Sequence, residues 1–345
     1  MRARQPPEGR RRRARHSGGS PPAVGSIPHT LRATTPRPTH ATAQLSNVLA
    51  ASVAAAILGV LCLPGAADAY GWPVKPFDKP HPIRGAFDDP RFHLGAESAL
   101  SAFHFGVDIA APDGTPVYSV SPGYVRMHSG DVTIRRPATG RAYGYWHVTP
   151  VVHTGEHVRL HQLLGFVASG WGHVHFAESV NGRYENPLRL RALTPFYDRT
   201  KPTVGGITLI STHGATVDPQ AVRGVVGVEA EIFDTPPLAP PAPWQVARLT
   251  PALVWWRLSQ GGTPVTTWKL SIDFNRGLLP SGAYNGVYAP GTYQNKANRP
   301  GHYLFWVLQA IDTATLADGV YTIDIVAADT HYNLGEASLD FAVVN

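Results

Sequence analysis

Glycine and proline interrupt this chain so often that long helices have little room between them. The 345 residues include 34 Gly and 32 Pro, and the apolar runs from Tyr70 to about Leu193 are short. These runs lack the period of about 3.6 residues that marks an amphipathic helix, and they have the length of strands. The sequence therefore predicts an all-β protein.

Turn residues separate the predicted strands of this first part. Pro112-Asp113-Gly114, Ser121-Pro122-Gly123 and Pro137-Ala138-Thr139-Gly140 are typical of tight turns. The strands that they and similar breaks delimit are 115–120, 124–128, 132–135, 142–148, 151–158 and 163–167, followed by a strand that starts at His173. We expect an antiparallel β-sheet that carries a groove.

Three histidine motifs follow one another within this sheet. They are His104-Phe105-Gly106-Val107-Asp108, Tyr145-Trp146-His147-Val148 and Gly172-His173-Val174-His175-Phe176. Side chains alternate faces along a strand, so the histidines of the third motif point the same way and can meet one ion. Zinc accepts nitrogen and oxygen ligands, and a catalytic zinc keeps three protein ligands and one open position. Five candidates exceed three ligands, so some of them must do other work.

The strand period also gives an expectation for His147. Tyr143, Tyr145 and His147 are two residues apart, so they share one face of the predicted strand 142–148. If that face is inward, His147 points into the same groove as the other histidines.

Four ordered blocks resemble the lysostaphin-type (LytM-like) zinc metallopeptidases, which cut peptide bonds in bacterial peptidoglycan. The blocks are His104 with Asp108, Gly114-Thr115-Pro116-Val117, Tyr145-Trp146-His147-Val148 and His173-Val174-His175-Phe176. Asn186-Pro187-Leu188 matches the end of the family pattern, so the resemblance covers about residues 72–195. It implies a β-sheet core domain and a peptidase activity.

The resemblance also implies how the five candidates divide their work. His104, Asp108 and His175 would hold one Zn²⁺ ion, while His147 and His173 stay unligated beside it. Zinc lowers the pKa of water toward about 7, and a neighbouring histidine can move protons or stabilise an oxyanion. We expect His147 and His173 to act on the water and on the tetrahedral intermediate.

The sequence departs from the family pattern after the last motif. Members usually place Glu directly after His-x-His-Phe, but Ala177 stands there and Glu178 comes one residue later. That position is not a predicted ligand, so we expect the departure to have only a small effect on the support of the metal ligands. Val148 replaces the usual Leu, so the cross-link that is cut is not transferred from the family.

The predicted function is a secreted zinc metalloendopeptidase that hydrolyses the cross-bridge or stem peptides of peptidoglycan. The first alternative is a non-catalytic protein on the same fold that binds peptidoglycan or activates a hydrolase. Such members typically lose a site residue, whereas this sequence keeps all five. The second alternative is an endopeptidase of extracellular Gly-rich proteins. The sequence predicts no particular oligomeric state.

The charge distribution argues against a nucleic-acid partner. Residues 1–69 hold nine of the 30 Lys and Arg and two of the 24 acidic residues, which leaves 21 basic and 22 acidic residues in the remainder. The net charge of +6 therefore comes from the leader.

The leader itself is typical of an export signal. A basic stretch precedes an apolar run at 45–63, and Ala67-Asp68-Ala69 forms a small-residue cleavage site before Tyr70. The alternative is a membrane anchor, in which case the uncleaved leader is the only membrane contact. Cleavage removes Cys62, the only cysteine, and with it thiol catalysis, thiolate zinc sites and disulfides. We expect an extracellular or cell-wall-associated protein.

The predicted organisation is a leader and signal peptide (1–69), a metallopeptidase domain (70–195), a linker (196–205) and a second β domain (206–345). The second domain shows seven strand-like runs, which suggest an immunoglobulin-like sandwich. These runs are 207–210, 225–233, 253–258, 267–272, 303–307, 320–327 and 337–344. Its tryptophans include Trp244, and we expect a spacer or a wall of the groove in preference to a wall-binding module.

Overall fold

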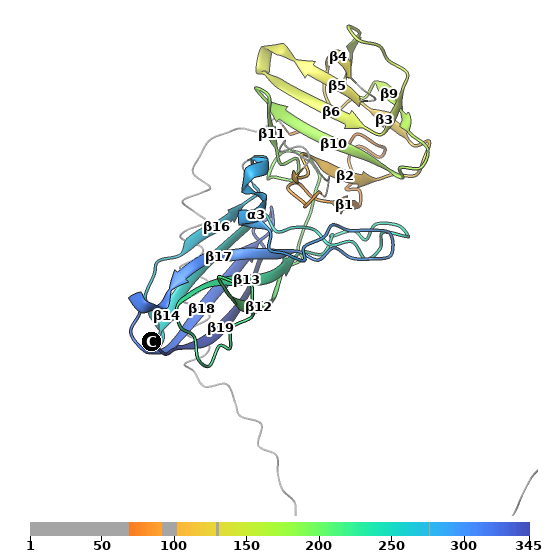
Figure 1. Cartoon of the computed structure of the whole chain (residues 1–345). Helices are drawn as coiled ribbons and strands as arrows, with labels where there is room; N and C mark the ends of the chain where they lie inside the picture. The colour runs from red at the N-terminus through yellow and green to blue at the C-terminus, as the bar shows by residue number, and fades with distance from the viewer. Residues whose placement is uncertain (1–68, 92–101, 129–130, 276) are drawn as a thin grey trace, which may run out of the picture. The chain divides into compact units, whose positions relative to one another are not determined.

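A computed structural model describes residues 69–91, 102–128, 131–275 and 277–345. Residues 1–68 of the predicted leader and signal peptide lie outside the described residues. Within the described ranges almost all regular structure is antiparallel β-sheet (Figure 1), which confirms the predicted fold class. No helix there is long and apolar enough to cross a membrane.

The first β unit comprises strands β1 to β11 in two sheets. Its main sheet has the order β1-β2-β10-β6-β5-β4-β8, with β11 paired to β10. These strands are β1 (Ile83–Gly85), β2 (Val107–Ala110), β4 (Gly123–His128), β5 (Asp131–Arg136), β6 (Arg141–Trp146), β8 (His157–Val158), β10 (His173–Val180) and β11 (Arg183–Glu185). The smaller sheet, in the order β3-β9-β7, comprises β3 (Pro116–Tyr118), β9 (Leu163–Val167) and β7 (Val148–Pro150), and the 3-10 turn η1 (Pro137–Thr139) joins β5 to β6.

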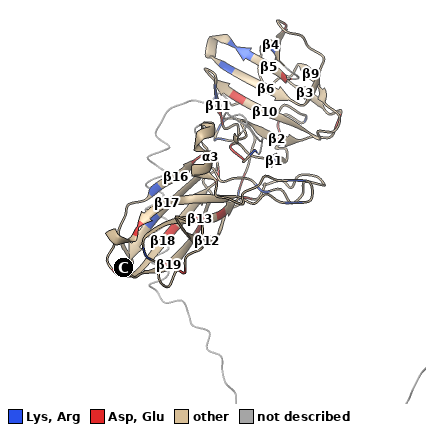
Figure 2. Cartoon of the chain, in the orientation of Figure 1, with Lys and Arg blue, Asp and Glu red and all other residues tan. Residues whose placement is uncertain are grey.

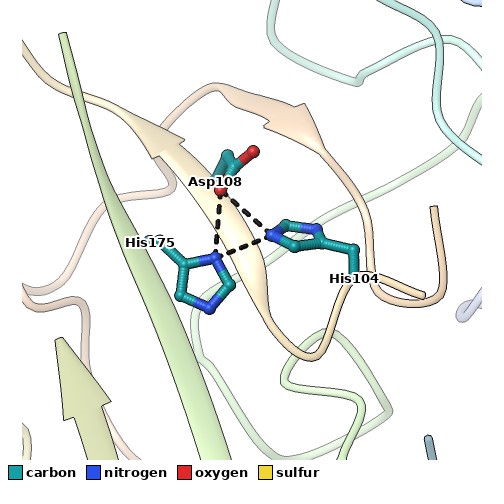
Figure 3. A group of neighbouring side chains, drawn as sticks. All are labelled: His104, Asp108 and His175. Carbon is teal, nitrogen blue, oxygen red and sulfur yellow. Dashed lines mark hydrogen bonds and ion pairs between the residues drawn. The ribbon is translucent and has the colours of Figure 1, made fainter. Parts of the chain in front are cut away.

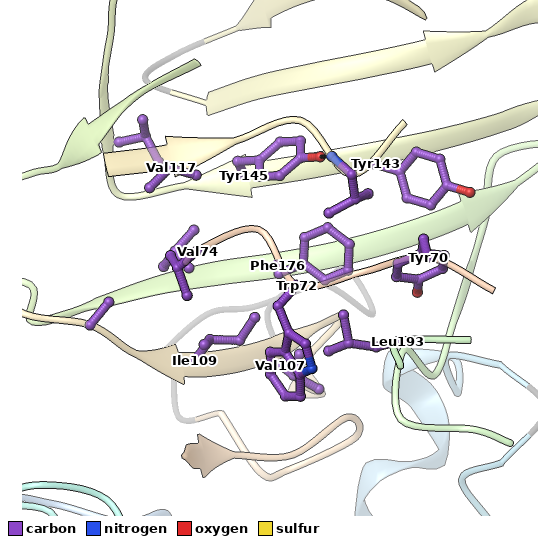
Figure 4. Packing of buried hydrophobic residues seen from close by; sticks show 14 of the residues in the cluster. Tyr70, Trp72, Val74, Val107, Ile109, Val117, Tyr143, Tyr145, Phe176 and Leu193 are labelled. Atoms are coloured by element: carbon purple, nitrogen blue, oxygen red, sulfur yellow. Dashed lines mark hydrogen bonds between the residues drawn. The ribbon is translucent and has the colours of Figure 1, made fainter. Parts of the chain in front are cut away.

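One face of the main sheet packs into an aromatic core (Figure 4). Tyr143, Tyr145 and Phe176 are fully buried there, and Trp72 covers them from the segment before β1. Because side chains alternate along β10, burial of Phe176 on this face sends its neighbour His175 to the opposite face. The core thus fixes which face of the sheet carries the histidines.

One predicted strand of the first β unit is wrong. Residues 151–158 form a bend and a turn, and only the pair His157–Val158 is a strand. Gly155 at the turn has φ of 91°, a conformation that suits a residue without Cβ. The Thr-Gly turn therefore ends the extended run that the valines on either side suggest.

The second β unit comprises β12 to β19, again in two antiparallel sheets. One sheet is β12 (Thr203–Ser211), β13 (Val225–Phe233) and β17 (Leu304–Asp312). The other is β15 (Thr263–Pro264), β14 (Leu253–Gln260), β18 (Gly319–Ala328) and β19 (Leu334–Val343), with β16 (Lys269–Asp273) paired to β14. Short helical turns are η2 (Ser281–Ala283), α3 (Tyr284–Val287) and η3 (Thr313–Thr315). Apolar residues of both sheets share one core; the relation to immunoglobulin-like modules stays a prediction.

The two β units belong to one compact part of the chain, and each contributes residues to the core of the other. Phe103, directly before His104, is fully buried in the core of the second unit, where its ring contacts Tyr284 and Tyr288. Leu249 of the second unit packs in the core of the first. Basic and acidic residues both occur on the strands of the two units (Figure 2). Phe103, the residue before the first histidine motif, is therefore held by the second β unit.

Candidate metal centre

The pairing of β2 with β10 brings together residues that are far apart in the sequence. His175 lies opposite Asp108 in the register of the two strands, and His173 lies two residues away on the same face. His104 stands just before β2, where its backbone N–H donates to the carbonyl of Asp89 at 2.9 Å. These three histidines and Asp108 thus meet at the end of one strand pair.

Three side chains converge on one point (Figure 3). His104 Nε2 lies 2.7 Å from His175 Nδ1, and Asp108 Oδ1 lies 3.1 Å from the former and 3.2 Å from the latter. All three ligand atoms lie within 4.8 Å of one another, and both histidines are buried. This group matches the ligand set that the sequence predicts.

The electrostatics of the group favour a bound cation. Burial lowers the pKa of His104 and lowers that of His175 to about 4, so both rings are neutral near pH 7. Burial alone would raise the pKa of Asp108, but His104, His173 and Arg91 hold it well below its usual range. Neutral imidazoles and an ionised carboxylate are the forms that bind metals.

Hydrogen bonding fixes which nitrogen of His104 faces the centre. Its Nδ1 lies 2.6 Å from the carbonyl of Ala86, so Nδ1 carries the proton and Nε2 presents a lone pair. Three acceptors therefore lie at close range: this lone pair, the carboxylate of Asp108 and Nδ1 of His175. A single proton on Nδ1 of His175 would leave part of this group without a hydrogen-bond donor. A divalent cation at this point satisfies all three, so the residues present fit zinc.

His147 and His173 lie beside these three side chains. The rings of His147 and His173 are 4.6 Å apart between centroids, and His173 Nε2 is 3.4 Å from Asp108 Oδ1. The ring of His147 also stacks on Trp171 at 3.5 Å between centroids. Burial, with the charge of His173 second, lowers the pKa of His147 to about 3. His147 is therefore an uncharged ring near pH 7.

His147 lies beside the other histidines, as predicted, but it does not share a strand face with Tyr143 and Tyr145, as the prediction assumed. Tyr143 and Tyr145 face the aromatic core, on the side of the sheet opposite His175. Strand β6 ends at Trp146, and His147 has φ of 63°, in the left-handed region. This turn of the backbone takes His147 off the face of the two tyrosines and toward His173.

Glu178 does not support the metal ligands in the structure. It shares the core face of β10 with Phe176, where its carboxylate is fully buried and accepts a hydrogen bond from Tyr70 Oη at 2.7 Å. It also forms ion pairs with Arg141 and, at 2.7 Å, with Arg189. Glu178 is therefore a buried structural anchor on the face opposite His175, and the small effect expected of the departure from the family pattern stays a prediction.

The sequence predicts that the second β unit is a spacer or a wall of the groove, but it places none of that unit's individual residues in the cavity that opens onto the centre. The cavity has a volume of about 460 Å³, and Arg84, Arg91, Trp244 and Asn295 line it together with the motif residues. Trp244 and Asn295 belong to the second β unit. None of the four forms a local motif, although two arginines close before the first histidine motif were a signal of positive charge near it.

The first β unit is similar to a known peptidase family. Residues 102–187 match the model of peptidase family M23, and this range contains all five candidate site residues. The chain carries an M23 peptidase domain. This confirms the lysostaphin-type family that the four motif blocks predict.

The relatives of the M23 domain include curated proteins and solved structures. A DD-carboxypeptidase/endopeptidase Mpg of Neisseria meningitidis is 31% identical over 101 residues, which are 27% of this chain and 24% of that protein. The chain therefore spans about a quarter of the length of the curated relatives it matches. The catalytic domain of lysostaphin from Staphylococcus simulans is 22% identical over 30% of this chain and 86% of that chain, with a TM-score of 0.26. Csd3 of Helicobacter pylori is 27% identical over 39% of this chain and 37% of that chain, with a TM-score of 0.30.

Proposed function

We propose that this protein is a secreted zinc metalloendopeptidase that hydrolyses peptide bonds in bacterial peptidoglycan. The observation that carries the proposal is the convergence of His104 Nε2, Asp108 Oδ1 and His175 Nδ1 inside the residues that match peptidase family M23. Three protein ligands leave room for water and substrate, as a catalytic zinc requires.

His104, Asp108 and His175 would hold the ion. When bound, zinc is a Lewis acid that lowers the pKa of water and polarises the peptide carbonyl. Oδ2 of Asp108 accepts a hydrogen bond from Arg91 at 2.9 Å, which leaves Oδ1 directed at the two ligand histidines. The arginine thus orients the carboxylate for its role.

His147 and His173 are placed to move protons. His147 is neutral, because burial lowers its pKa to about 3, and we assign it to orient and deprotonate the attacking water. Nδ1 of His173 lies 2.8 Å from the carbonyl of Trp171, which holds the ring while Nε2 faces the centre. From there His173 can stabilise the tetrahedral oxyanion or deliver a proton to the leaving amine.

The substrate class is supported by the relatives. The Neisseria relative is described as a DD-carboxypeptidase/endopeptidase, and lysostaphin is described as an antimicrobial peptidase. All five site residues are present here, which favours hydrolysis over binding without cleavage. We assign the export of the protein to residues 1–69, with Tyr70 as the first residue after cleavage.

The test is the clearing of a purified peptidoglycan suspension by the zinc-loaded protein. Loss of turbidity in the wild type and not in His104→Ala is the expected result. Zinc binding without clearing would favour a peptidoglycan-binding or activating protein. Faster digestion of a soluble Gly-rich protein than of peptidoglycan would favour the second alternative. Mass spectrometry of the exported protein checks the cleavage site at Tyr70.

A further inference from the structure

Arg84 carries a positive charge into the cavity beside the candidate metal centre. It is the middle residue of β1, the edge strand of the main sheet. One guanidinium nitrogen contacts Nδ1 of His173, and the guanidinium carbon lies 4.2 Å from the ring centroid of Trp244. The cation therefore lies between a motif histidine and a tryptophan of the second β unit.

The second β unit also holds the backbone of Arg84. Asn295 Nδ2 donates a hydrogen bond to the carbonyl of Arg84 at 3.1 Å. The Oδ1 atom of Asn295 accepts from the backbone N–H groups of Arg248 at 2.9 Å and Gly301 at 2.7 Å, and the residue is buried. Since Asn295 is fixed at both ends of its amide, the strand and the side chain of Arg84 have little freedom.

Arg84 differs from its neighbour Arg91 in its lack of a counter-ion. Arg91 pairs with Asp108 at 2.9 Å and with Asp89 at 3.8 Å. In the described part of the chain, no carboxylate lies within ion-pair distance of Arg84. Burial lowers the pKa of Arg84, because part of its hydration is lost without a full return in charge pairing. Proteins pair or ligate charges that they withdraw from water, and the charge of Asp108 offsets this cost only in part, so the guanidinium can take an anionic partner in this cavity.

We propose that Arg84 binds a carboxylate of the substrate peptide close to the bond that is cut, and that the second β unit is part of this substrate pocket. Trp244 and Asn295 are positioning residues, because they act through Arg84. The proposal rests on the proposed function, and it names the substrate class of the same site as a peptide with a free carboxylate. The carboxylate belongs either to the carboxyl terminus of the peptide or to an acidic side chain.

The test compares peptides that differ only in their carboxylates. A muropeptide released from peptidoglycan is used with all carboxylates free, with the terminal carboxylate amidated, or with the side-chain carboxylates amidated. Its binding to the zinc-loaded full chain is measured by calorimetry in a His147→Ala background, which prevents turnover. We expect one amidation to weaken binding by about 10- to 100-fold, the usual effect of losing a charged hydrogen bond. The amidation that does so identifies the source of the carboxylate.

Variants then assign the effect to Arg84. Arg84→Met should bind the free and amidated forms equally, whereas Arg84→Lys should keep part of the preference. Trp244→Leu should reduce the preference because the guanidinium loses its support. Trp268→Leu is the matched control, since Trp268 supports Arg257 at 4.7 Å in the same way and lines no part of this cavity. Trp268→Leu should show the same preference among the three muropeptides as the His147→Ala protein without this change.

Two results would overturn the proposal. If the His147→Ala protein bound all three muropeptides equally, the site would not recognise a carboxylate. If the preference for the free carboxylate survived in Arg84→Met, a residue other than Arg84 would bind it. Either result leaves the proposed peptidase in place if the wild type takes up zinc and clears peptidoglycan. Failure of zinc uptake and clearing would instead contradict the proposed function itself.

Discussion

Removal of the Glu178 carboxylate should destabilise the M23 domain strongly without changing the candidate metal ligands. Glu178 is fully buried and accepts from Tyr70, Arg141 and Arg189. Breaking a buried ion pair from one side costs about 3–5 kcal/mol, because the remaining charges stay withdrawn from water. A single domain has only about 5–15 kcal/mol of stability, so Glu178→Ala should lose a large part of it.

Urea unfolding of the zinc-free protein measures this loss. Glu185→Ala is the matched control, because Glu185 pairs with the same Arg189 at 2.9 Å but is 29% exposed in its side chain. An exposed pair contributes about 0–1 kcal/mol. Zinc uptake by folded Glu178→Ala should equal that of the wild type, since the side chain lies on the opposite face from His175. A loss below about 1 kcal/mol, equal to that of the control, would refute the buried-anchor argument.

Three further predictions concern stability and metal binding. Burial and the charge of Asp198 raise the pKa of Asp234 to about 7, so the folded state holds this proton more tightly. Its stabilisation is present at low pH and is lost as the pH rises through about 7; urea unfolding should show a decrease of about 3 kcal/mol between pH 5 and 8 that Asp234→Asn lacks. A Cβ on Gly335 would lie 1.7 Å from the Pro202 carbonyl oxygen, so Gly335→Ala should cost about 1–3 kcal/mol in the same assay. His104→Ala should lose bound zinc by elemental analysis, whereas His147→Ala should retain it.

Each of these predictions has its own contrary outcome. The same pH dependence in wild type and Asp234→Asn would place the proton elsewhere. Gly205→Ala is the control for Gly335→Ala, because nothing lies within 4 Å of its Cβ. Equal stability of the two alanine variants would contradict the close approach of strand β19 to the chain before β12. Loss of zinc from His147→Ala would make that residue a ligand.

The alternation of side chains along strands predicts much of the site. It places His173 and His175 on one face, and the order of the motifs predicts that Asp108 and His104 join them. The same alternation, applied to Glu178, puts that residue with Phe176 on the core face, so this contact was within reach of the sequence. These features follow from local geometry, and local geometry is what a sequence pattern carries.

Other features depend on contacts between distant segments. The position of His147 depends on one backbone conformation with φ of 63°, which no propensity of histidine predicts. Arg84 lies next to Trp244 only because the two β units pack together, and Phe103 reaches the second core for the same reason. Such contacts join residues that are far apart in the chain, so local sequence patterns do not predict them.

The most direct test of the central claim is a parallel measurement of zinc content and of new amino groups released from purified peptidoglycan. The wild type and His147→Ala should each bind zinc at equal stoichiometry. Only the wild type should release amino groups, because the ligands His104, Asp108 and His175 remain while the proton acceptor is lost. A wild type that binds no zinc, or that binds it and releases no amino groups, would contradict the assignment of this centre as the site of peptide hydrolysis.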